Sequence, residues 1–265
     1  MSLLTLPYPA IDPIIFQVGP LAIRWYSLAY ICGLLFAWRY MLHLASRSPD
    51  VASHEDVDDF LVWATLGIVL GGRIGYTLFY NFEYYAANPL VVLQIWKGGI
   101  SFHGGVLGVI FSGLVFVKRR GISPLRFADI VACATPVGLM LGRLANFING
   151  ELYGRVSDVP WAMVFPRGGS EPRHPSQLYE AVLEGLVLFI VLAVLSRIKM
   201  IRKRPGVLLG VFLLGYALAR TTVELFRQPD AHIGILAVGL TMGQWLSLPM
   251  AVGGIYLIIG NSKKV

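Results

Sequence analysis

The sequence contains few charged residues. Asp, Glu, Lys and Arg make up only 14% of its 265 residues, whereas hydrophobic residues make up 56% and the mean hydropathy is +0.66. A soluble domain of this length carries more polar residues than that. The composition therefore excludes an ordinary soluble protein and indicates a chain whose solvent is the lipid bilayer.

Several chemical signatures are absent as well. Cys32 and Cys133 lie in different apolar runs, and neither belongs to a CxxC or Cys/His ligand spacing. The other histidines form no ligand spacing with His103. There is no GxSxG motif, no HExxH motif and no paired-carboxylate constellation, so serine, metal and aspartyl hydrolysis lose their support. We expect no metal and no cofactor.

The net charge of +7 does not indicate nucleic-acid binding, because the basic residues lie in short clusters between apolar runs. No Lys or Arg precedes Arg24, so we expect no cleavable signal peptide. A membrane-crossing helix needs about 20 mainly apolar residues. The sequence predicts an all-α polytopic integral membrane protein, a single catalytic domain over 1–265 with about seven crossings at 20–43, 60–80, 101–117, 126–148, 177–196, 206–226 and 241–260.

Basic loops predict the orientation of these crossings, because they prefer the cytoplasm. Clusters follow the third, fifth and seventh spans, at 118–126, 197–204 and 263–264. We therefore expect the N-terminus outside and the C-terminus inside. Loops 81–100 and 149–176 then lie outside, where their prolines and glycines predict a small periplasmic cap.

One stretch is unusually polar for its position. GRLANFINGELYGR (142–155) places Arg143, Asn146 and Glu151 at the end of an apolar run. Charged and amide groups at membrane depth cost roughly 2.5 to 3.5 kcal/mol each, so they are kept mainly where they function. A guanidinium suits a phosphate, and the amide suits a second oxygen or a glycerol hydroxyl. The structural alternative for Arg143 is a pair with Glu151 or with backbone carbonyls.

A second polar column lies in the sixth span. Tyr216, Arg220 and Glu224 are spaced four apart and share a helical face. They are suited to hold an anionic group, or to form a salt bridge beside a phenol. Glu180 and Glu184, in HPSQLYEAVLE, are candidate partners of an arginine rather than catalytic residues.

The predicted topology brings the polar groups of five spans to the outer leaflet, including Tyr26, Arg73 and His103. His103 stands among glycines, Gly104 included, that permit the close approach of a ligand. A histidine accepts a proton near neutral pH, although one at a helix start is often only hydrogen-bonded. Ion translocators need polar groups through the full depth, so this one-sided pattern favours a reaction on a lipid headgroup.

These residues resemble one family, the bacterial phosphatidylglycerol–prolipoprotein diacylglyceryl transferases. The run GRLANFINGELYGR is similar to the family signature, and five further blocks follow the family's order: RWYSLAY (24–30), GGRIGY (71–76), FHGG (102–105), HPSQLYE (174–180) and ELFRQPD (224–230). The resemblance extends over nearly the whole chain.

The resemblance implies a seven-span inner-membrane enzyme that transfers the diacylglyceryl group of phosphatidylglycerol to the lipobox cysteine thiol of a prolipoprotein. A thioether and glycerol 1-phosphate are the implied products. Family residues match six positions: His103, Arg143, Asn146, Gly154, Tyr216 and Arg220. Of these we expect His103, Arg143, Tyr216 and Arg220 to be catalytic. The expected substrate-binding residues are Tyr26, Arg73, Gly104, Asn146, Glu151, Gly154 and Glu224.

Two other interpretations remain at this stage. In a lipid or anion transporter, the arginines would bind a moving substrate. In a structural membrane scaffold, loss of Arg143 would leave lipidation unchanged.

Overall fold

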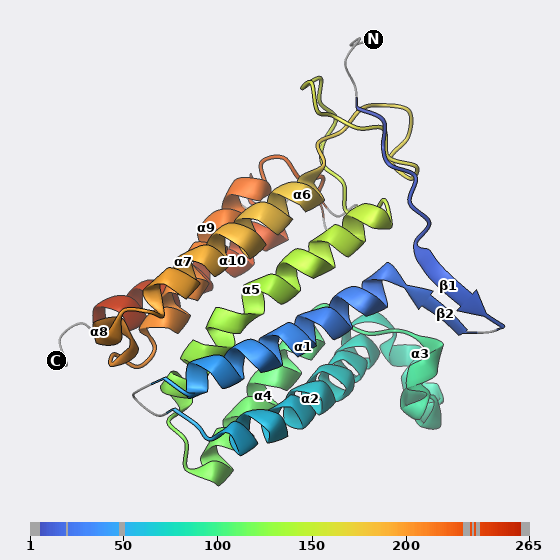
Figure 1. The fold of residues 1–265 in the computed structure, drawn as a ribbon. Helices are drawn as coiled ribbons and strands as arrows, with labels where there is room; N and C mark the ends of the chain where they lie inside the picture. Colours follow the sequence, from blue (N-terminus) through green and yellow to red (C-terminus); the bar gives the residue numbers. More distant parts are fainter. Residues whose placement is uncertain are drawn as a thin grey trace. The chain divides into compact units, whose positions relative to one another are not determined.

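The structure is a computed structural model that describes residues 6–19, 21–47, 51–229, 234, 236 and 239–260. Two compact units divide the described residues: those within 1–44 and 128–265 form the first, and those within 45–127 form the second. Helices make up most of both units (Figure 1). Some residues that carry sequence-based predictions lie outside the described residues: Asp230 of the ELFRQPD block, and Lys263 and Lys264 of the last basic cluster.

The first unit begins with a two-stranded antiparallel hairpin. Strand β1 (Ile14–Val18) pairs with β2 (Leu21–Arg24), and Ile14 stands opposite Arg24. Helix α1 (Trp25–Ala45) follows directly. The hairpin was not predicted, because its alternation is only a few residues long and merges with the apolar run of the first span.

Four long helical segments complete the first unit. Helix α5 (Pro124–Ile148) is followed, after a loop, by the continuous segment of α6 (Ser176–Glu180), the π-helix η3 (Ala181–Val187) and α7 (Leu188–Leu195). The short α8 (Lys199–Arg202) leads to α9 (Val207–Val223), which packs along α10 (Met242–Gly260) (Figure 1).

Asp129 of α5 caps the start of α9. Its two carboxylate oxygens accept the backbone N–H groups of Gly206 and Leu209, each at 2.7 Å. The first N–H groups of a helix lack partners within the helix, and a negative charge there is favourable. One of the few acids of the predicted inner half therefore has a structural role.

The second unit contains α2 (His54–Tyr80), α3 (Phe82–Ala87), the 3-10 turns η1 (Pro89–Leu93) and η2 (Ile95–Lys97), and α4 (Phe102–Arg120). Ser53 begins α2 with a capping box, in which its side chain accepts the Asp56 N–H. Ser101 caps α4 by accepting the Gly104 N–H at 3.3 Å.

The predicted class of fold is confirmed. Six helical segments of the described residues are long and apolar enough to cross a membrane, and Val207–Val223 is a shorter apolar helix. They coincide with the seven predicted crossings, so the chain is a multi-pass all-α membrane protein. Loop 149–176 contains isolated bridges such as Val156–Arg173 and Met163–Arg173. A cap shared with loop 81–100 and the single domain over 1–265 stay predictions.

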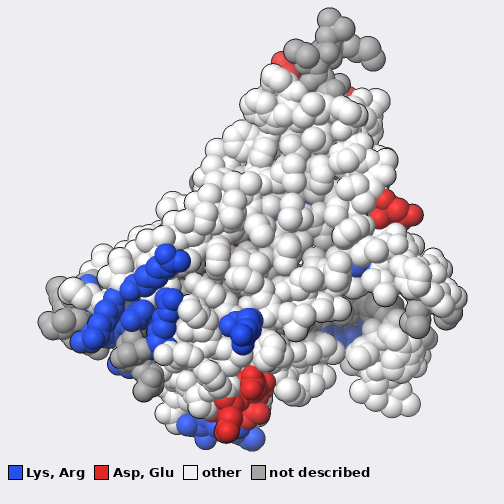
Figure 2. Space-filling model, in the orientation of Figure 1, with Lys and Arg blue, Asp and Glu red and all other residues white. Residues whose placement is uncertain are grey.

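Most of the surface visible in Figure 2 carries no charge, as a lipid-facing protein requires. Lys and Arg gather over the region of α8, where the sequence has Arg197, Lys199, Arg202, Lys203 and Arg204. This gathering is the feature that the orientation prediction uses.

Glycines allow α2 and α4 to approach closely. A Cβ on Gly75 would lie 2.7 Å from Gly104 Cα, and one on Gly108 would lie 2.9 Å from Gly71 Cα. Small residues four apart are the usual device for close helix packing in a bilayer.

We predict that Gly108→Ala destabilises the protein by about 1–3 kcal/mol, because the added methyl group meets the backbone of α2. Gly113→Ala, in the same helix, is the matched control, since its methyl group would meet only the Phe60 ring at 3.5 Å. Thermal unfolding in detergent measures both. Equal melting temperatures for the two variants would contradict this account of the α2–α4 packing.

Candidate active site

Arg143 reaches from α5 to two glutamates of the neighbouring segment. Its Nε lies 3.0 Å from Glu180 Oε2, and its Nη2 lies 3.5 Å from Glu184 Oε2. Gly185 permits this approach, because a Cβ there would lie 2.9 Å from Met140 Cα. The absence of a side chain at 185 therefore brings η3 close enough to α5 for the ion pairs to form.

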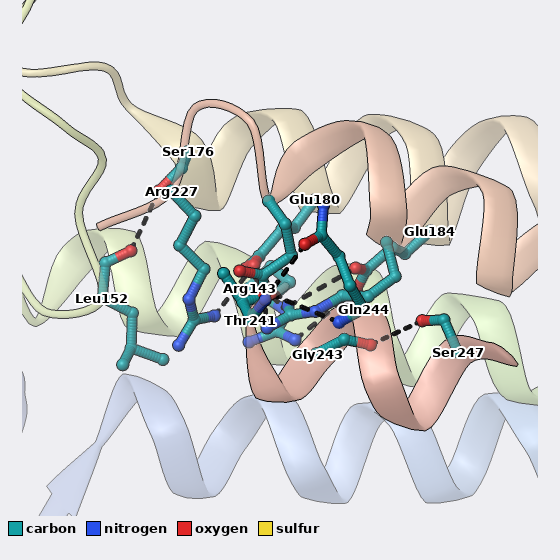
Figure 3. A network of polar contacts seen from close by, with 12 residues as sticks. Arg143, Leu152, Ser176, Glu180, Glu184, Arg227, Thr241, Gly243, Gln244 and Ser247 are labelled. Atoms are coloured by element: carbon teal, nitrogen blue, oxygen red, sulfur yellow. Dashed lines mark hydrogen bonds and ion pairs between the residues drawn. The ribbon is translucent and has the colours of Figure 1, made fainter. Parts of the chain in front are cut away.

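Two further arginines converge on Glu180, one from α9 and one from the residues after it; the latter, Arg227, is labelled near Glu180 in Figure 3. Arg220 Nη1 lies 2.7 Å from Glu180 Oε1, and Arg227 Nη1 lies 2.9 Å from the same oxygen. Glu180 thus faces three guanidinium groups. Arg220 Nη2 also pairs with Glu224 Oε1 at 2.5 Å, as the four-residue spacing predicted.

The acids lie deeper than the arginines. The side chains of Glu180 and Glu184 are 0% exposed, whereas those of Arg143 and Arg220 are 17% and 13% exposed. Buried carboxylates need such partners, because an unpaired buried charge costs several kcal/mol. The acids are therefore fully enclosed, whereas the arginine side chains that pair with them stay partly accessible.

Asn146 and Asn149 both contact the next acid along the chain. Their Nδ2 groups donate to Glu151 Oε1 at 2.8 and 3.0 Å. Because a carboxylate only accepts hydrogen bonds, it fixes each amide with its N–H₂ group toward Glu151 and its carbonyl oxygen away. Glu151 therefore pairs with these amides and not with Arg143, which was the structural alternative considered for that arginine.

Gly154 stands at a close crossing of three chain segments. Its N–H donates to His174 O at 2.8 Å, and it bridges to Arg227. A Cβ at 154 would lie 2.6 Å from Phe226 O and from His174 Cβ. Arg155 strengthens the crossing, because its Nε donates to Arg227 O at 3.0 Å. Glycine at 154 is thus required to tie loop 149–176 to the end of α9.

His174 is a hydrogen-bonding group at this crossing. Burial lowers the pKa of His174 from its ordinary value, because the charged form of the ring is disfavoured there. Its Nδ1 lies 3.1 Å from Tyr179 Oη, which also accepts from Trp161 Nε1 at 2.6 Å. These contacts order the start of α6.

Both tyrosines of the predicted site lie in the first unit. Tyr216 is half-buried on α9, one turn before Arg220, and the described residues give its hydroxyl no hydrogen-bond partner. Tyr26 contacts Tyr30, with ring centroids 5.2 Å apart, at the start of α1. Helices α1 and α5 run antiparallel and touch where a Gly33 Cβ would lie 3.1 Å from Gly138 Cα (Figure 1). Tyr26 and Arg143 therefore lie on the same side of this contact.

The other predicted residues belong to the second unit. His103 is exposed in the first turn of α4. Gly104 is buried against Gly71 and Gly75 of α2, which gives it a packing role. The approach of His103 to the arginines of the first unit and the contact of Gly104 with a ligand both stay predictions.

Arg73 organises the loop before α4. Its guanidinium donates to the backbone oxygens of Val92 at 2.8 Å, of Gly98 at 2.5 Å and of three further residues, Val91, Gln94 and Gly99. Its side chain also lies over the ring of Tyr85. An arginine side chain has five N–H donors, and five backbone oxygens of this loop accept hydrogen bonds from Arg73. A positioning role for Arg73 follows, and direct substrate binding stays untested.

The sequence predicts an arginine partner for Glu180 and Glu184, and this prediction is confirmed. The sequence did not predict that Glu180 pairs with three arginines or that Arg227 is one of them. The feature that pointed to these ion pairs was the presence of two acids four residues apart within an apolar helix. Their spacing alone does not say which helices supply the partners.

Comparison with known proteins decides the family. The sequence profile described as prolipoprotein diacylglyceryl transferase matches residues 13–260. The chain belongs to this family.

Relatives named phosphatidylglycerol–prolipoprotein diacylglyceryl transferase match the chain along almost its whole length. The protein from Rhodospirillum rubrum is 58% identical over 259 residues, covering 97% of this chain and 94% of its own. That from Paramagnetospirillum magneticum is 59% identical, covering 96% and 94%, and that from Azospirillum brasilense is 55% identical, covering 97% and 96%. The range that matches the family, 13–260, spans the positions from Arg143 to Arg227.

We predict that Glu180→Gln destabilises this family member by about 3 kcal/mol or more, because it leaves three buried or half-buried arginines without their shared partner. Asp59→Asn is the control, since the exposed pair of Asp59 with Arg120 contributes little. Thermal unfolding in detergent distinguishes them. A Glu180→Gln protein as stable as Asp59→Asn would refute the central role of Glu180.

Proposed function

We propose that this chain transfers the diacylglyceryl group of phosphatidylglycerol to the lipobox cysteine thiol of a prolipoprotein, forming a thioether and releasing glycerol 1-phosphate. The observation that carries the proposal is the arginine–glutamate network. Arg143 and Arg220 pair with fully buried acids and are themselves partly accessible. Family membership adds the lipid and the protein substrate for which the relatives are named.

The network suits a departing phosphate. In the proposed reaction the thiol loses its proton to a base, and its sulfur forms a bond to a glycerol carbon. The bond from that carbon to the phosphate oxygen breaks, and its electron pair stays on the phosphate. Negative charge therefore grows on the phosphate oxygens in the transition state, where fixed guanidinium groups stabilise it most.

We assign Arg143 and Arg220 to the phosphate. Arg143 Nη1 has no acceptor among the described residues, so a phosphate oxygen can take it without breaking an ion pair. Glu224 is assigned to hold Arg220, whose Nη2 it contacts at 2.5 Å. Tyr216, one turn away on α9, is assigned to position or polarise a group beside Arg220.

The headgroup is assigned to the residues around Glu151. The amide of Asn146 turns its carbonyl oxygen away from Glu151, which suits a hydroxyl donor such as the terminal glycerol. Tyr26 and Glu151 complete this assignment. Gly154 acts by allowing loop 149–176 to cross the end of α9.

His103 is the proposed base for the thiol, and Gly104 and Arg73 are proposed substrate-binding residues. The exposed position of His103 in the first turn of α4 supports access by a thiol. The thiolate is the reactive nucleophile, so a base or nearby cations must favour it.

The proposed location is the inner membrane of a bacterium, with the N-terminus outside and the C-terminus inside. The basic residues between α7 and α9 support this orientation. Arg143, Arg220 and His103 then act at the periplasmic leaflet, and loops 81–100 and 149–176 form the cap above it.

We predict that purified protein incubated with phosphatidylglycerol and a lipobox peptide yields the thioether product by mass spectrometry, and that Arg143→Ala lowers its rate about 10²- to 10³-fold. Arg167→Ala, an exposed loop arginine, is the matched control and keeps the wild-type rate. Product formation without vesicles excludes a transporter. An Arg143→Ala protein that lipidates normally would support a scaffold and overturn the phosphate assignment.

We predict that His103→Gln lowers the transfer rate at neutral pH and recovers much of the loss at alkaline pH, where the thiol ionises without a base. The rate is measured across pH, with His54→Gln as a histidine control because His54 contacts Ser46. A His103→Gln deficit that is constant across pH would assign His103 another role.

A further inference from the structure

The turn that follows α5 has an uncommon backbone. The backbone angle φ of Leu152 is 57°. Among the described residues, Leu152 is the only one other than glycine whose φ is positive. A leucine in this left-handed region is disfavoured by its Cβ. Since Leu152 is 37% exposed, its side-chain packing does not account for the conformation. Something else must hold the turn.

Two buried side chains from the start of α6 hold it. Gln177 Nε2 donates to Glu151 O at 2.6 Å, and Ser176 Oγ donates to Leu152 O at 3.0 Å. Both Ser176 and Gln177 are 0% exposed. The pair therefore contacts the two successive carbonyls whose direction sets the turn, and Figure 3 shows the contact between Ser176 and Leu152.

The side chain of Gln177 carries an energetic cost for the fold. Its Oε1 is buried and has no hydrogen-bond partner. An unsatisfied buried polar atom destabilises a fold, and an apolar side chain of similar shape would avoid it. Stability alone therefore does not explain an amide side chain at this position. The hydrogen bond that its N–H group donates to Glu151 O does explain it.

Resting on the proposed function, we infer that Ser176 and Gln177 are positioning residues for the headgroup site. By fixing the carbonyls of Glu151 and Leu152 they hold the strained turn, and the turn aims the Glu151 carboxylate at Asn146. The amide of Asn146 is thereby held with its carbonyl oxygen toward the substrate. Strained backbone persists only where the surroundings impose it, and such strain concentrates at functional sites.

Gln177→Met separates positioning from stability, because it removes both the donor and the unsatisfied oxygen. We expect a melting temperature equal to or above wild type, together with a kcat for peptide lipidation about ten- to hundredfold lower. Ser176→Ala, which removes the second contact, is expected to lower kcat in the same direction. Hydrogen exchange of the backbone amides at 150–153 should be at least about tenfold faster in both variants.

Leu152→Gly provides a rescue. Glycine adopts positive φ without penalty, so the turn needs less support from α6. We expect Leu152→Gly alone to keep near wild-type activity, and the double variant Gln177→Met/Leu152→Gly to regain part of the lost kcat. A purely packing role for Gln177 predicts no such rescue.

The outcomes separate this inference from the proposed function. Absence of thioether product with wild-type protein would overturn the proposed function, and hydrogen exchange at 150–153 would still test the turn. Wild-type exchange and activity in Gln177→Met would overturn the positioning role. So would a lower melting temperature and lower activity in both Gln177→Met and Ser176→Ala without rescue by Leu152→Gly, because that result describes structural support only.

Discussion

The structure of the first unit depends on balancing charge inside an apolar helix bundle. Three arginines and three glutamates meet there, and Glu180 alone contacts Arg143, Arg220 and Arg227. None of these groups is stable at such depth by itself, since a buried charge without a partner costs several kcal/mol. Each helix of the network therefore needs the others, and the ion pairs fix α5, α6 and α9 relative to one another within this unit.

Backbone features make the balance possible. Gly185 lets Met140 approach η3, and Arg143 then lies one turn further along α5, within reach of Glu180 and Glu184. The acids themselves occur where the helix changes from α to π, at Glu180–Ala181. Short π-helical insertions are rare and often mark functional positions, because they rotate the side chains that follow. A site of buried ions thus requires an irregular helix and a missing side chain as well as the ions.

The crossings were predictable from the sequence because hydrophobic length is a local property. Arg143, Arg220 and Glu224 were identified for a related reason: a charge inside an apolar run is conspicuous, and a spacing of four places Arg220 beside Glu224. The shared role of Glu180 was not predictable, since it depends on how three helices pack. The loop contacts of Arg73 and the helix contacts of Gly104 were not predictable either, because they arise only in three dimensions. The β1–β2 hairpin is too short for its alternation to be seen beside a long apolar run.

Under the proposed function, the balance between the arginines and the glutamates also affects how easily the product leaves the site. The phosphate of the lipid substrate is a diester with one negative charge. The phosphate of the product, glycerol 1-phosphate, is a monoester that carries about 1.5 to 2 negative charges at pH 7. A cluster with excess positive charge would bind the product more tightly than the substrate and retain it. Because Glu180, Glu184 and Glu224 offset the arginines, the network is close to neutral as a whole. Arg143 and Arg220 can then stabilise charge at short range in the transition state, while the acids behind them weaken the hold on the more highly charged product.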